Sequence, residues 1–378
     1  MKVGIFETTH FEGAYPIIKL FDNGQNDIVI FCYAQSYRQF QFLFKNEINK
    51  YDWVIKKDEE STFHFINTIF KEARKRKLDI LYLNTVTDNH SIYALYISLL
   101  KNTRVILTLH DINNYFESAP GIHFKKIIRS IGKKWLINKV KEFNVVSLTM
   151  VDYLKSKLPS SKKVHCLPGA IFEEENLIRN SIKPGQPLNI VVPGSIDSRR
   201  RNYATVFELL DKINHRGLPV NITLLGGPYG DYGMKIIEQC KLYSMNHRNL
   251  QFYEMDIVDQ PEFDKVMNDA HFVFIPSVID TIISDGVPET YGVSISSGNQ
   301  FDIIKHSRPF IAPVELKVDP YLEPACIRYD LPDDIFAEIK ACLASPMRYD
   351  AMQEKAITAS SNYTIEKVRD RNRDIFSE

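Results

Sequence analysis

Two segments of the sequence carry residue types suited to proton transfer and to binding hydroxyl groups. His10 and Glu12 lie in the stretch TTHFEGAYP, and His110 and Asp111 follow the apolar run RVILTL. A histidine titrates near neutral pH and can bind a hydroxyl group or take its proton, and a nearby carboxylate can orient the ring. We therefore select His10, Glu12 and His110 as candidate catalytic residues. A solvated loop with a helix-capping acid is the alternative at His10, and a turn-closing pair is the alternative at His110.

A second group of residues is suited to binding phosphate. The segment PGSIDSRRRNY at 193–203 contains Gly194 and three consecutive arginines, of which we select Arg200 and Arg201. Guanidinium groups match the oxygens of a diphosphate, and the N-terminus of a following helix adds backbone donors. A solvated charge cluster is the alternative. The turn GGPYGDYG at 226–233, with Gly227, lacks the spacing of a dinucleotide fingerprint but would let a ligand approach the backbone; a plain turn is the alternative.

The segment PETYGVSISSGNQFDIIKHSRPFIAP at 288–313 combines carboxylates with small polar residues. Such a loop can offer backbone N–H groups to an anion, and its acids can bind sugar hydroxyls. The candidate ligand-binding residues of this segment are Glu289, Gly292, Ser297, Gly298 and Asp302.

An α/β scaffold must position these segments. Short runs rich in Val, Ile, Leu and Phe alternate with amphipathic stretches, which is typical of buried parallel strands joined by helices. The predicted strands lie at 3–6, 27–32, 79–84, 104–110, 144–149 and 164–168, and then at 188–194, 220–227, 250–254, 271–277, 309–313 and 326–330. The candidate segments follow predicted strands, and ligands of open α/β sheets bind beyond the carboxyl ends of the strands.

Composition and charge limit the possible functions. The chain has 47 Lys and Arg residues and 47 Asp and Glu residues, so a globally basic surface for nucleic acid is absent. The five cysteines form no C-x-x-C pair, which argues against a disulfide framework or a structural zinc site and for a reducing compartment. No signal-peptide pattern begins the sequence, and no run approaches the roughly 18 apolar residues of a membrane span. We expect a cytoplasmic protein.

The polar stretch NSIKPGQP at 180–187 separates two similar series of strands. It contains two prolines and a glycine, which is typical of a linker. Two α/β halves joined in this way leave a cleft between them, where the strand-end segments would meet.

With these segments, the chain resembles the GT-B glycosyltransferases, and most closely the group that uses nucleotide-sugar donors without a metal ion. His110–Asp111 is similar to the family's His-Asp pair, Gly194–Arg201 to its phosphate-binding loop, and Glu289–Gly292 to the start of its acidic motif. The family's second acid is missing at its usual place, which Ser297 occupies. In the family that acid lies seven residues before a proline, a place held here by Asp302, so the resemblance implies a five-residue insertion.

The resemblance implies two Rossmann-like domains facing across a cleft: an acceptor domain at 1–182 and a donor domain at 183–363. A polar helix at 364–378 resembles the one that crosses back to the first domain. The implied donor is a UDP- or GDP-linked sugar, with Glu289 on the sugar as a further candidate catalytic residue and Asp302 on the ribose. No D-x-D pair occurs in the sequence, which disfavours the metal-dependent glycosyltransferase fold.

The function implied is therefore transfer of a hexose, without metal or cofactor, to a hydroxyl acceptor in surface-polysaccharide or glycan assembly. The acceptor would be a glycan or a lipid-linked molecule. Two alternatives stay open: a nucleotide-sugar epimerase, which can share this two-domain plan, and a non-catalytic subunit that only binds a partner.

One stretch has the pattern of a helix on a membrane surface. Residues 124–141, FKKIIRSIGKKWLINKVK, contain seven basic residues and no acid. Apolar residues recur at helical spacing: Phe124, Ile127, Ile128, Ile131, Trp135 and Leu136. A basic face, an apolar face and a tryptophan suit an interfacial helix on anionic lipid, and predict a peripheral position on the inner face of a membrane. The alternative is that the apolar stripe packs on the sheet and the lysines are solvated.

Overall fold

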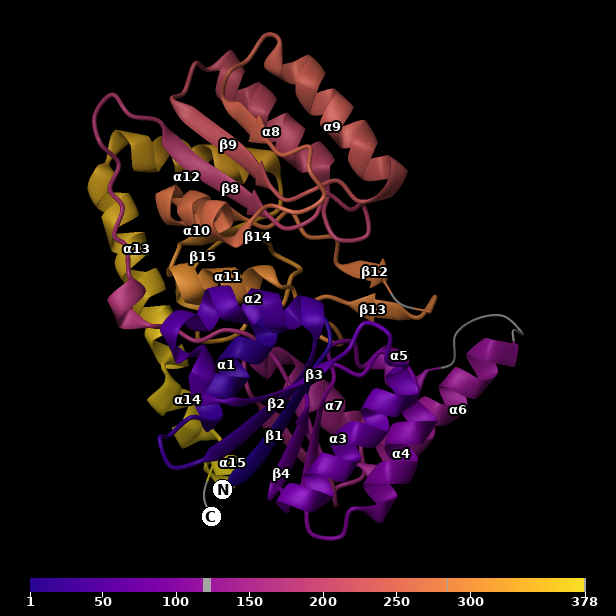
Figure 1. Ribbon diagram of the computed structural model, residues 1–378. Coiled ribbons are helices and arrows are strands. Elements are labelled where there is room, and N and C mark those ends of the chain that lie inside the picture. The colour runs from indigo at the N-terminus through magenta and orange to yellow at the C-terminus, as the bar shows by residue number, and fades with distance from the viewer. Residues whose placement is uncertain (118–123, 284, 377–378) are drawn as a thin grey trace.

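The computed structural model describes residues 1–117, 124–283 and 285–376. These residues form two units, one above the other in Figure 1, and each unit contains a parallel sheet covered by helices. The predicted α/β class is therefore confirmed.

The N-terminal unit contains a seven-stranded sheet in the order β3-β2-β1-β4-β5-β6-β7. The strands are β1 (Lys2–Glu7), β2 (Asp27–Tyr33), β3 (Asp52–Lys56), β4 (Ile80–Leu83), β5 (Arg104–Thr108), β6 (Glu142–Val145) and β7 (Lys163–Cys166). The helices are α1 (Phe11–Phe21), α2 (Ala34–Phe44), α3 (Thr62–Arg76), α4 (His90–Leu99), α5 (Asn113–Phe116), α6 (Phe124–Lys139) and α7 (Val151–Lys157).

The C-terminal unit contains a six-stranded sheet in the order β10-β9-β8-β11-β14-β15. The strands are β8 (Leu188–Pro193), β9 (Val220–Leu225), β10 (Leu250–Phe252), β11 (Phe272–Phe274), β14 (Phe310–Pro313) and β15 (Cys326–Tyr329), with a separate hairpin of β12 (Asp280–Ile282) and β13 (Pro288–Thr290). The helices are α8 (Tyr203–His215), α9 (Gly230–Ser244), α10 (Gln260–Asp269), α11 (Asn299–His306), α12 (Pro332–Ala344) and α13 (Pro346–Ser360). Two last helices, α14 (Ile365–Arg371) and α15 (Arg373–Phe376), return to the N-terminal unit.

Both sheets have the same connectivity. All neighbouring strands of the two sheets run parallel, and the strand order reverses between β1 and β4 in one sheet and between β8 and β11 in the other. Ligands of doubly wound sheets bind at such switch points, beyond the carboxyl ends of the strands. The loops after these four strands are therefore the ones to examine.

Buried apolar strands hold each sheet between layers of helices. In β2, every residue from Ile28 to Cys32 is buried. One face of the N-terminal sheet packs against α3, α4 and α6, and the other packs against α1 and α14. Continuous apolar runs of this kind are typical of parallel strands covered on both faces.

Two elements were not predicted from the sequence. The edge strand β3 has only three consecutive apolar residues, Trp53 to Ile55, and none of its residues is fully buried. The β12–β13 hairpin has only three residues in each strand and turns at Asp285 and Gly286, whose φ angles are 54° and 82°. An Asp-Gly pair is a known hairpin signal, so this element could have been predicted.

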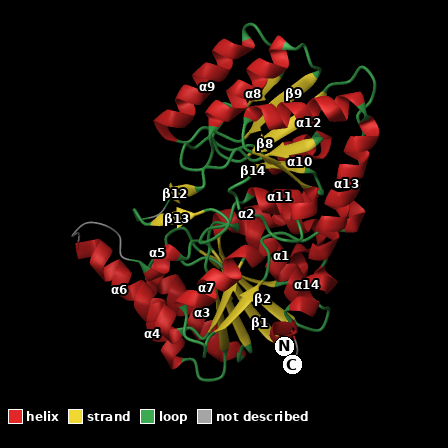
Figure 2. Cartoon of the chain, turned by 180° about the vertical axis from the view of Figure 1, so that it is seen from behind, coloured by secondary structure: helices red, strands yellow, loops and turns green. Residues whose placement is uncertain are grey.

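The chain crosses between the two units twice, along one side of the molecule. The predicted linker at 180–187 lies in the first crossing and has no regular secondary structure. The second crossing follows α13, which runs down the side of the molecule in Figures 1 and 2. The Phe172 N–H donates to the Tyr363 carbonyl at 3.0 Å, so the two crossings lie side by side.

The predicted helix at 364–378 is two short helices, α14 and α15, separated at Asn372; residues 377–378 lie outside the described ranges. The Asn372 side chain bonds the backbone N–H and carbonyl of Cys166, at the end of β7. The Arg369 guanidinium donates to three carbonyls at the end of α1: Lys19, Leu20 and Asp22. These contacts fix the end of the chain on the N-terminal unit.

We expect Arg369→Ala to lower the free energy of unfolding by roughly 1.5–3 kcal/mol, because it leaves three helix-end carbonyls without their charged donor. Urea denaturation measures the change. Arg373→Ala is the control, because that side chain is 78% exposed and pairs with Asp370 across one turn. Equal destabilisation by the two substitutions would contradict the anchoring role of Arg369.

Candidate active site

Both switch points open into one cleft of about 1830 Å³ between the units. The predicted site residues that line it are His10, Glu12, His110, Gly194, Arg200, Arg201, Gly227, Ser297, Gly298 and Asp302. Two other predicted residues, Glu289 and Gly292, do not line it.

The buried carboxylate of Glu7 organises the N-terminal wall of this cleft. Glu7 is the last residue of β1 and is 0% exposed. Its Oε1 accepts hydrogen bonds from three consecutive backbone N–H groups: Thr8 (2.6 Å), Thr9 (2.7 Å) and His10 (2.8 Å). Its Oε2 accepts from the side chains of Asn84 (2.6 Å) and Thr85 (2.9 Å), which follow β4. The two loops of the N-terminal switch point therefore share one anion.

Glu7 was not among the site residues predicted from the sequence. A single carboxylate at the end of an apolar strand forms no motif, and its five donors come from two loops far apart in the sequence. Its place at the end of the first strand was the available signal.

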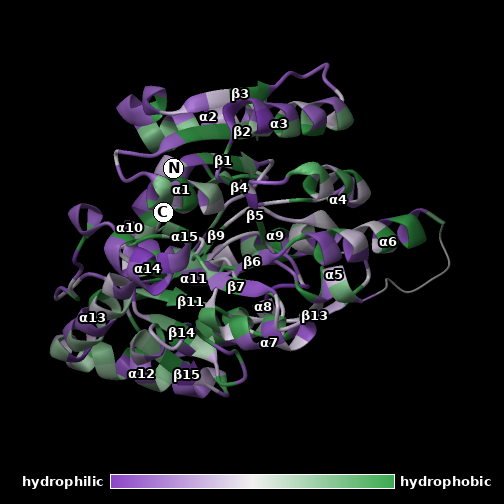
Figure 3. Ribbon diagram, turned by 90° about the horizontal axis from the view of Figure 1, so that it is seen from below, coloured by the Kyte–Doolittle hydropathy of each residue, from purple (hydrophilic) through white to green (hydrophobic). Residues whose placement is uncertain are grey.

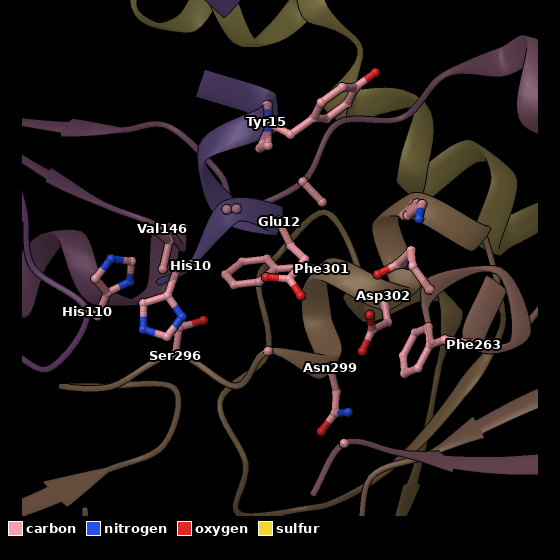
Figure 4. A pocket seen from close by; sticks show the side chains of 18 of the residues that line it. His10, Glu12, Tyr15, His110, Val146, Phe263, Ser296, Asn299, Phe301 and Asp302 are labelled. Atoms are coloured by element: carbon pink, nitrogen blue, oxygen red, sulfur yellow. The ribbon is translucent and has the colours of Figure 1, made fainter. Parts of the chain in front are cut away.

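His10 and His110 lie side by side on this wall (Figure 4), with ring centroids 5.5 Å apart. Burial and the neighbouring His110 ring lower the pKa of His10 below its usual value. Burial also lowers the pKa of His110. Both rings are therefore neutral near pH 7 and able to accept a proton.

The surroundings of His110 set its tautomer. Its Nε2 lies 2.9 Å from the carbonyl oxygen of Asn84. Because a carbonyl can only accept, Nε2 carries the proton and Nδ1 is the free acceptor of the ring. The ring of His10 makes no hydrogen bond to any described residue, which leaves it open to the cleft.

Glu12 lies in the first turn of α1 and points into the cleft (Figure 4). Burial raises the pKa of its carboxyl group. Among the described residues it makes no hydrogen bond to the His10 ring, so the expected orienting role of Glu12 is not observed. Glu7 holds the backbone of His10 instead, and Glu12 stays a candidate for binding a hydroxyl group.

Two glycine turns packed against each other begin the C-terminal wall. Gly194, directly after β8, has a φ of 91°. A Cβ atom on Gly226 would meet the Gly194 carbonyl, and one on Gly227 would meet the Asp256 carbonyl. Only glycine allows backbones to approach this closely.

The predicted arginine cluster divides into residues with different environments. Arg201 is buried, and its guanidinium donates to the carbonyls of Pro193 and Ser195 and to the Asn299 side chain. Arg201 therefore holds the loop together, which corrects the expectation that it offers its charge freely to a diphosphate. Arg200 also lines the cleft, its side chain is 41% exposed, and its Nε lies 3.6 Å from the Asp197 carboxylate. Of the two predicted arginines, Arg200 is the one available to a ligand.

The N-terminus of α11 lies on the same wall. Gly298 is the N-cap residue, and the space beside its Cα is open. The Ser297 hydroxyl donates to the Asn299 side chain at 3.2 Å, and Asn299 donates to the Pro193 carbonyl at 2.9 Å. These two side chains therefore hold the start of α11 against the end of β8. The first turn of α11 lines the cleft, as Arg200 does, and its backbone N–H groups and helix dipole suit an anion.

Asp302 lies one turn further along α11, with its carboxylate across the cleft from Glu12 (Figure 4). Burial raises the pKa of Asp302 to about 7, although Lys305 and Arg201 oppose the shift. No described residue donates a hydrogen bond to this carboxylate. It is therefore available to ligand hydroxyl groups.

Glu289 does not line the cleft. It lies on β13 and is 2% exposed, and its Oε1 accepts from the Asn114 N–H at 2.9 Å. Its Oε2 has no partner among the described residues, and burial raises the pKa of the carboxyl group to about 7. The expected contact between Glu289 and a donor sugar is therefore corrected. Gly292 forms the turn after β13, where a Cβ atom would meet the Lys317 carbonyl.

Glu289 belongs to a seam between the units, made by residues 111–114 and 288–295. The seam includes a β-bridge between Asp111 and Ile295. It also includes hydrogen bonds from the Ile112 N–H to the Ser294 carbonyl (2.8 Å) and from the Asn113 side chain to the Pro288 carbonyl (2.9 Å). The seam closes the edge of the cleft near His110.

The sequence matches no family model and no curated protein sequence. Solved structures match over the whole chain. Anabaena HepE in complex with UDP and glucose has a TM-score of 0.68 at 10% identity, with 100% of both chains covered. The lipopolysaccharide outer core galactosyltransferase WaaB has a TM-score of 0.60 at 12% identity, covering 100% of this chain and 99% of that one. The chain has the GT-B fold.

A third solved structure that matches the chain is described as an enzyme of a different activity. The UDP-GlcNAc 2-epimerase from Neisseria meningitidis bound to UDP-GlcNAc has a TM-score of 0.55 at 12% identity, covering 98% of this chain and 100% of that one. The predicted GT-B architecture is thus confirmed, and the cleft of this chain is the GT-B interdomain cleft.

We expect Glu7→Gln to lower the free energy of unfolding by on the order of 3 kcal/mol, because buried donors lose their anionic acceptor. Glu12→Gln is the matched control, since Glu12 is reached from the cleft and makes no such network. Chemical denaturation of the two variants provides the comparison. A Glu7→Gln protein as stable as the Glu12→Gln protein would show that the hydrogen bonds to Glu7 do not stabilise the fold.

We expect Glu289→Gln to stabilise the protein at pH 8 by roughly 1–3 kcal/mol relative to pH 5. Burial raises the pKa of Glu289 from 4.5 to about 7, so folding favours the protonated form. The wild-type protein therefore loses stability as the pH rises through this window, and the amide cannot ionise. Denaturation at pH 5 and pH 8 tests this, with the exposed Glu315→Gln as control. An unchanged pH dependence in Glu289→Gln would refute the assignment.

Proposed function

We propose that this GT-B chain is a glycosyltransferase that moves a hexose from a nucleotide-diphosphate sugar to a hydroxyl acceptor. The observation that carries the proposal is the opposition of two walls in one cleft. Arg200 and the N-terminus of α11 face the cleft on one side, and the neutral His10 and His110 face it on the other. Such a transfer needs both walls, since negative charge develops on the leaving diphosphate and a proton must leave the acceptor.

In the proposed reaction, the acceptor oxygen bonds to the anomeric carbon of the sugar while the bond from that carbon to the diphosphate breaks. The diphosphate leaves with the bonding electrons, and Arg200 and the α11 N-terminus stabilise its charge. His10 takes the acceptor proton on its open ring. Asp302 binds the ribose hydroxyls, and Glu12 binds a hydroxyl of the acceptor.

We propose that the reaction needs no metal ion or organic cofactor. Across the described ranges, no group of three His, Cys, Asp or Glu side chains is arranged to hold a metal ion. Arg200 and a helix N-terminus can neutralise a diphosphate without one. A UDP-linked donor is supported by the descriptions of HepE and of the epimerase, and a GDP-linked donor is the other candidate.

The proposed acceptor is a glycan or lipid-linked molecule in surface-polysaccharide assembly, met at the cytoplasmic face of a membrane. The described residues include no helix that is long and apolar enough to cross a bilayer. The basic helix α6 borders the cleft through Arg129 and Lys133, which supports an acceptor presented at a surface.

The first experiment is a thermal-stability screen with UDP, GDP, ADP and CMP, because a ligand that binds only the native state raises its stability. The stabilising nucleotide then selects the sugars for product analysis with the purified chain. Release of the nucleotide diphosphate with sugar transfer or hydrolysis supports the transferase. Conversion of the donor to its epimer favours the epimerase, and binding without turnover favours a non-catalytic subunit.

We expect Arg200→Ala to weaken binding of the stabilising nucleoside diphosphate by about ten- to a hundredfold, since a charged hydrogen bond is worth roughly 1.5–3 kcal/mol. Binding of the parent nucleoside should stay unchanged. Calorimetric titration of both ligands measures the difference.

Arg199→Ala is the control for Arg200→Ala. Arg199 has the same charge on the same loop, but it pairs more closely with Asp197, at 2.7 Å against 3.6 Å for Arg200, and it does not line the cleft. Equal losses of diphosphate and nucleoside affinity in Arg200→Ala would remove Arg200 from the diphosphate site.

A further inference from the structure

Helix α6 exposes the apolar stripe that the sequence pattern singled out. The exposed side chains are Phe124 (77%), Ile127 (43%), Ile128 (50%), Ile131 (60%) and Trp135 (37%). We call these five residues the α6 patch. Only Leu136 of the predicted stripe is buried. The alternative that this stripe packs on the sheet is therefore wrong for five of its six members.

The opposite face of α6 is the one that packs. Gly132, Lys133, Leu136 and Ile137 are buried. A Cβ atom on Gly132 would lie 2.6 Å from the Ser91 hydroxyl, so this glycine lets α6 approach α4 closely. The helix is thus fixed to the protein by one face, and the α6 patch points away from it. No described residue covers the patch.

The charge around the α6 patch selects its partner. Lys125, Lys134 and Lys139 are exposed on the same helix, and α6 contains no acidic residue, although the whole chain has no net charge. In Figure 3, α6 lies at the periphery and carries hydrophobic and hydrophilic residues along its length. A second copy packed face to face through this surface would bring lysines against lysines. An anionic lipid surface accepts both the apolar side chains and the positive charge.

We infer that α6 is an interfacial helix that seats the protein on anionic lipid through the α6 patch. The inner face of the same helix reaches the cleft. Lys133 contacts Asp285 of the β12–β13 hairpin at 2.7 Å, and Arg129 contacts it at 2.8 Å. A lipid-seated α6 therefore places this end of the cleft at the headgroups. If the chain is the transferase proposed above, its acceptor is then a molecule with a lipid anchor that enters the cleft beside α6.

Vesicle co-sedimentation of the full chain tests the inference. The vesicles are phosphatidylcholine alone, or phosphatidylcholine with about one third phosphatidylglycerol, at low and moderate salt. We expect binding to the anionic vesicles that weakens with salt and is far lower on the zwitterionic ones. Equal binding to both vesicle types, or no binding to anionic vesicles at low salt, would overturn the inference.

Paired variants locate the contact. Ile128→Asp with Ile131→Asp should lower the partition onto anionic vesicles by at least about tenfold, because two apolar side chains leave the interface. The control is Met234→Asp with Leu242→Asp on α9, where the side chains are 52% and 63% exposed. Unchanged binding in the α6 variant, or an equal loss in the α9 variant, overturns the inference.

Two further measurements distinguish a wrong lipid contact from a wrong transferase function. Sedimentation velocity without lipid tests the second-copy alternative: concentration-dependent self-association that the α6 substitutions abolish would assign the patch to a homodimer and overturn the lipid inference. Thermal stabilisation by UDP or GDP tests the cleft in each variant. A chain that binds anionic vesicles through α6 but no nucleotide refutes the transferase and keeps the lipid contact. A chain with the reverse behaviour keeps the transferase and refutes the lipid contact.

Discussion

A single buried anion sets the geometry of the N-terminal wall. The carboxylate of Glu7 lies at the end of the first strand, where water cannot solvate it, and an unpaired charge there would cost on the order of several kcal/mol. Five donors from the loops after β1 and β4 satisfy it. One of those donors, Thr85, also lies 3.4 Å from the His110 ring. The positions of both histidines therefore depend on this carboxylate, although it does not line the cleft itself.

The C-terminal wall is built on the opposite charge. Arg201 is buried beside the end of β8, where two carbonyl oxygens and the Asn299 amide oxygen accept from its terminal nitrogens, while its Nε has no partner among the described residues. Each switch point thus contains one buried ion with its compensating groups, an anion in one unit and a cation in the other. A guanidinium at the end of β8 adds positive potential to the wall that carries Arg200 and the α11 N-terminus. The two ions make the C-terminal wall the one suited to a diphosphate.

The sequence predicted the parts of this arrangement that depend on local pattern. Apolar runs located the strands of both sheets except the edge strand β3, and strand ends located the loops of the cleft. Side-chain direction was not predictable in the same way. Arg200 and Arg201 are neighbours with the same charge, yet one is exposed to the cleft and the other is buried. Glu289 has the motif of a sugar contact but lies on a hairpin that turns it toward α5. In each case the group that binds the buried side chain comes from a segment far away in the sequence, so the spacing of nearby residues does not predict it.

The two units are joined by covalent connections on one side and by noncovalent contacts on the other. On one side lie the covalent crossings, which meet at Phe172 and Tyr363. On the other lies the seam, a few polar contacts that include a buried carboxyl group with a pKa of about 7 at Glu289. The seam can part by breaking polar contacts alone, whereas the backbone keeps the units joined at the crossings. Any opening of the cleft must therefore pivot about the crossings and part the seam. Because Asp285 of the same hairpin also holds Lys133, such a motion pulls on α6, and a lipid surface that fixes α6 would bear directly on how the cleft opens.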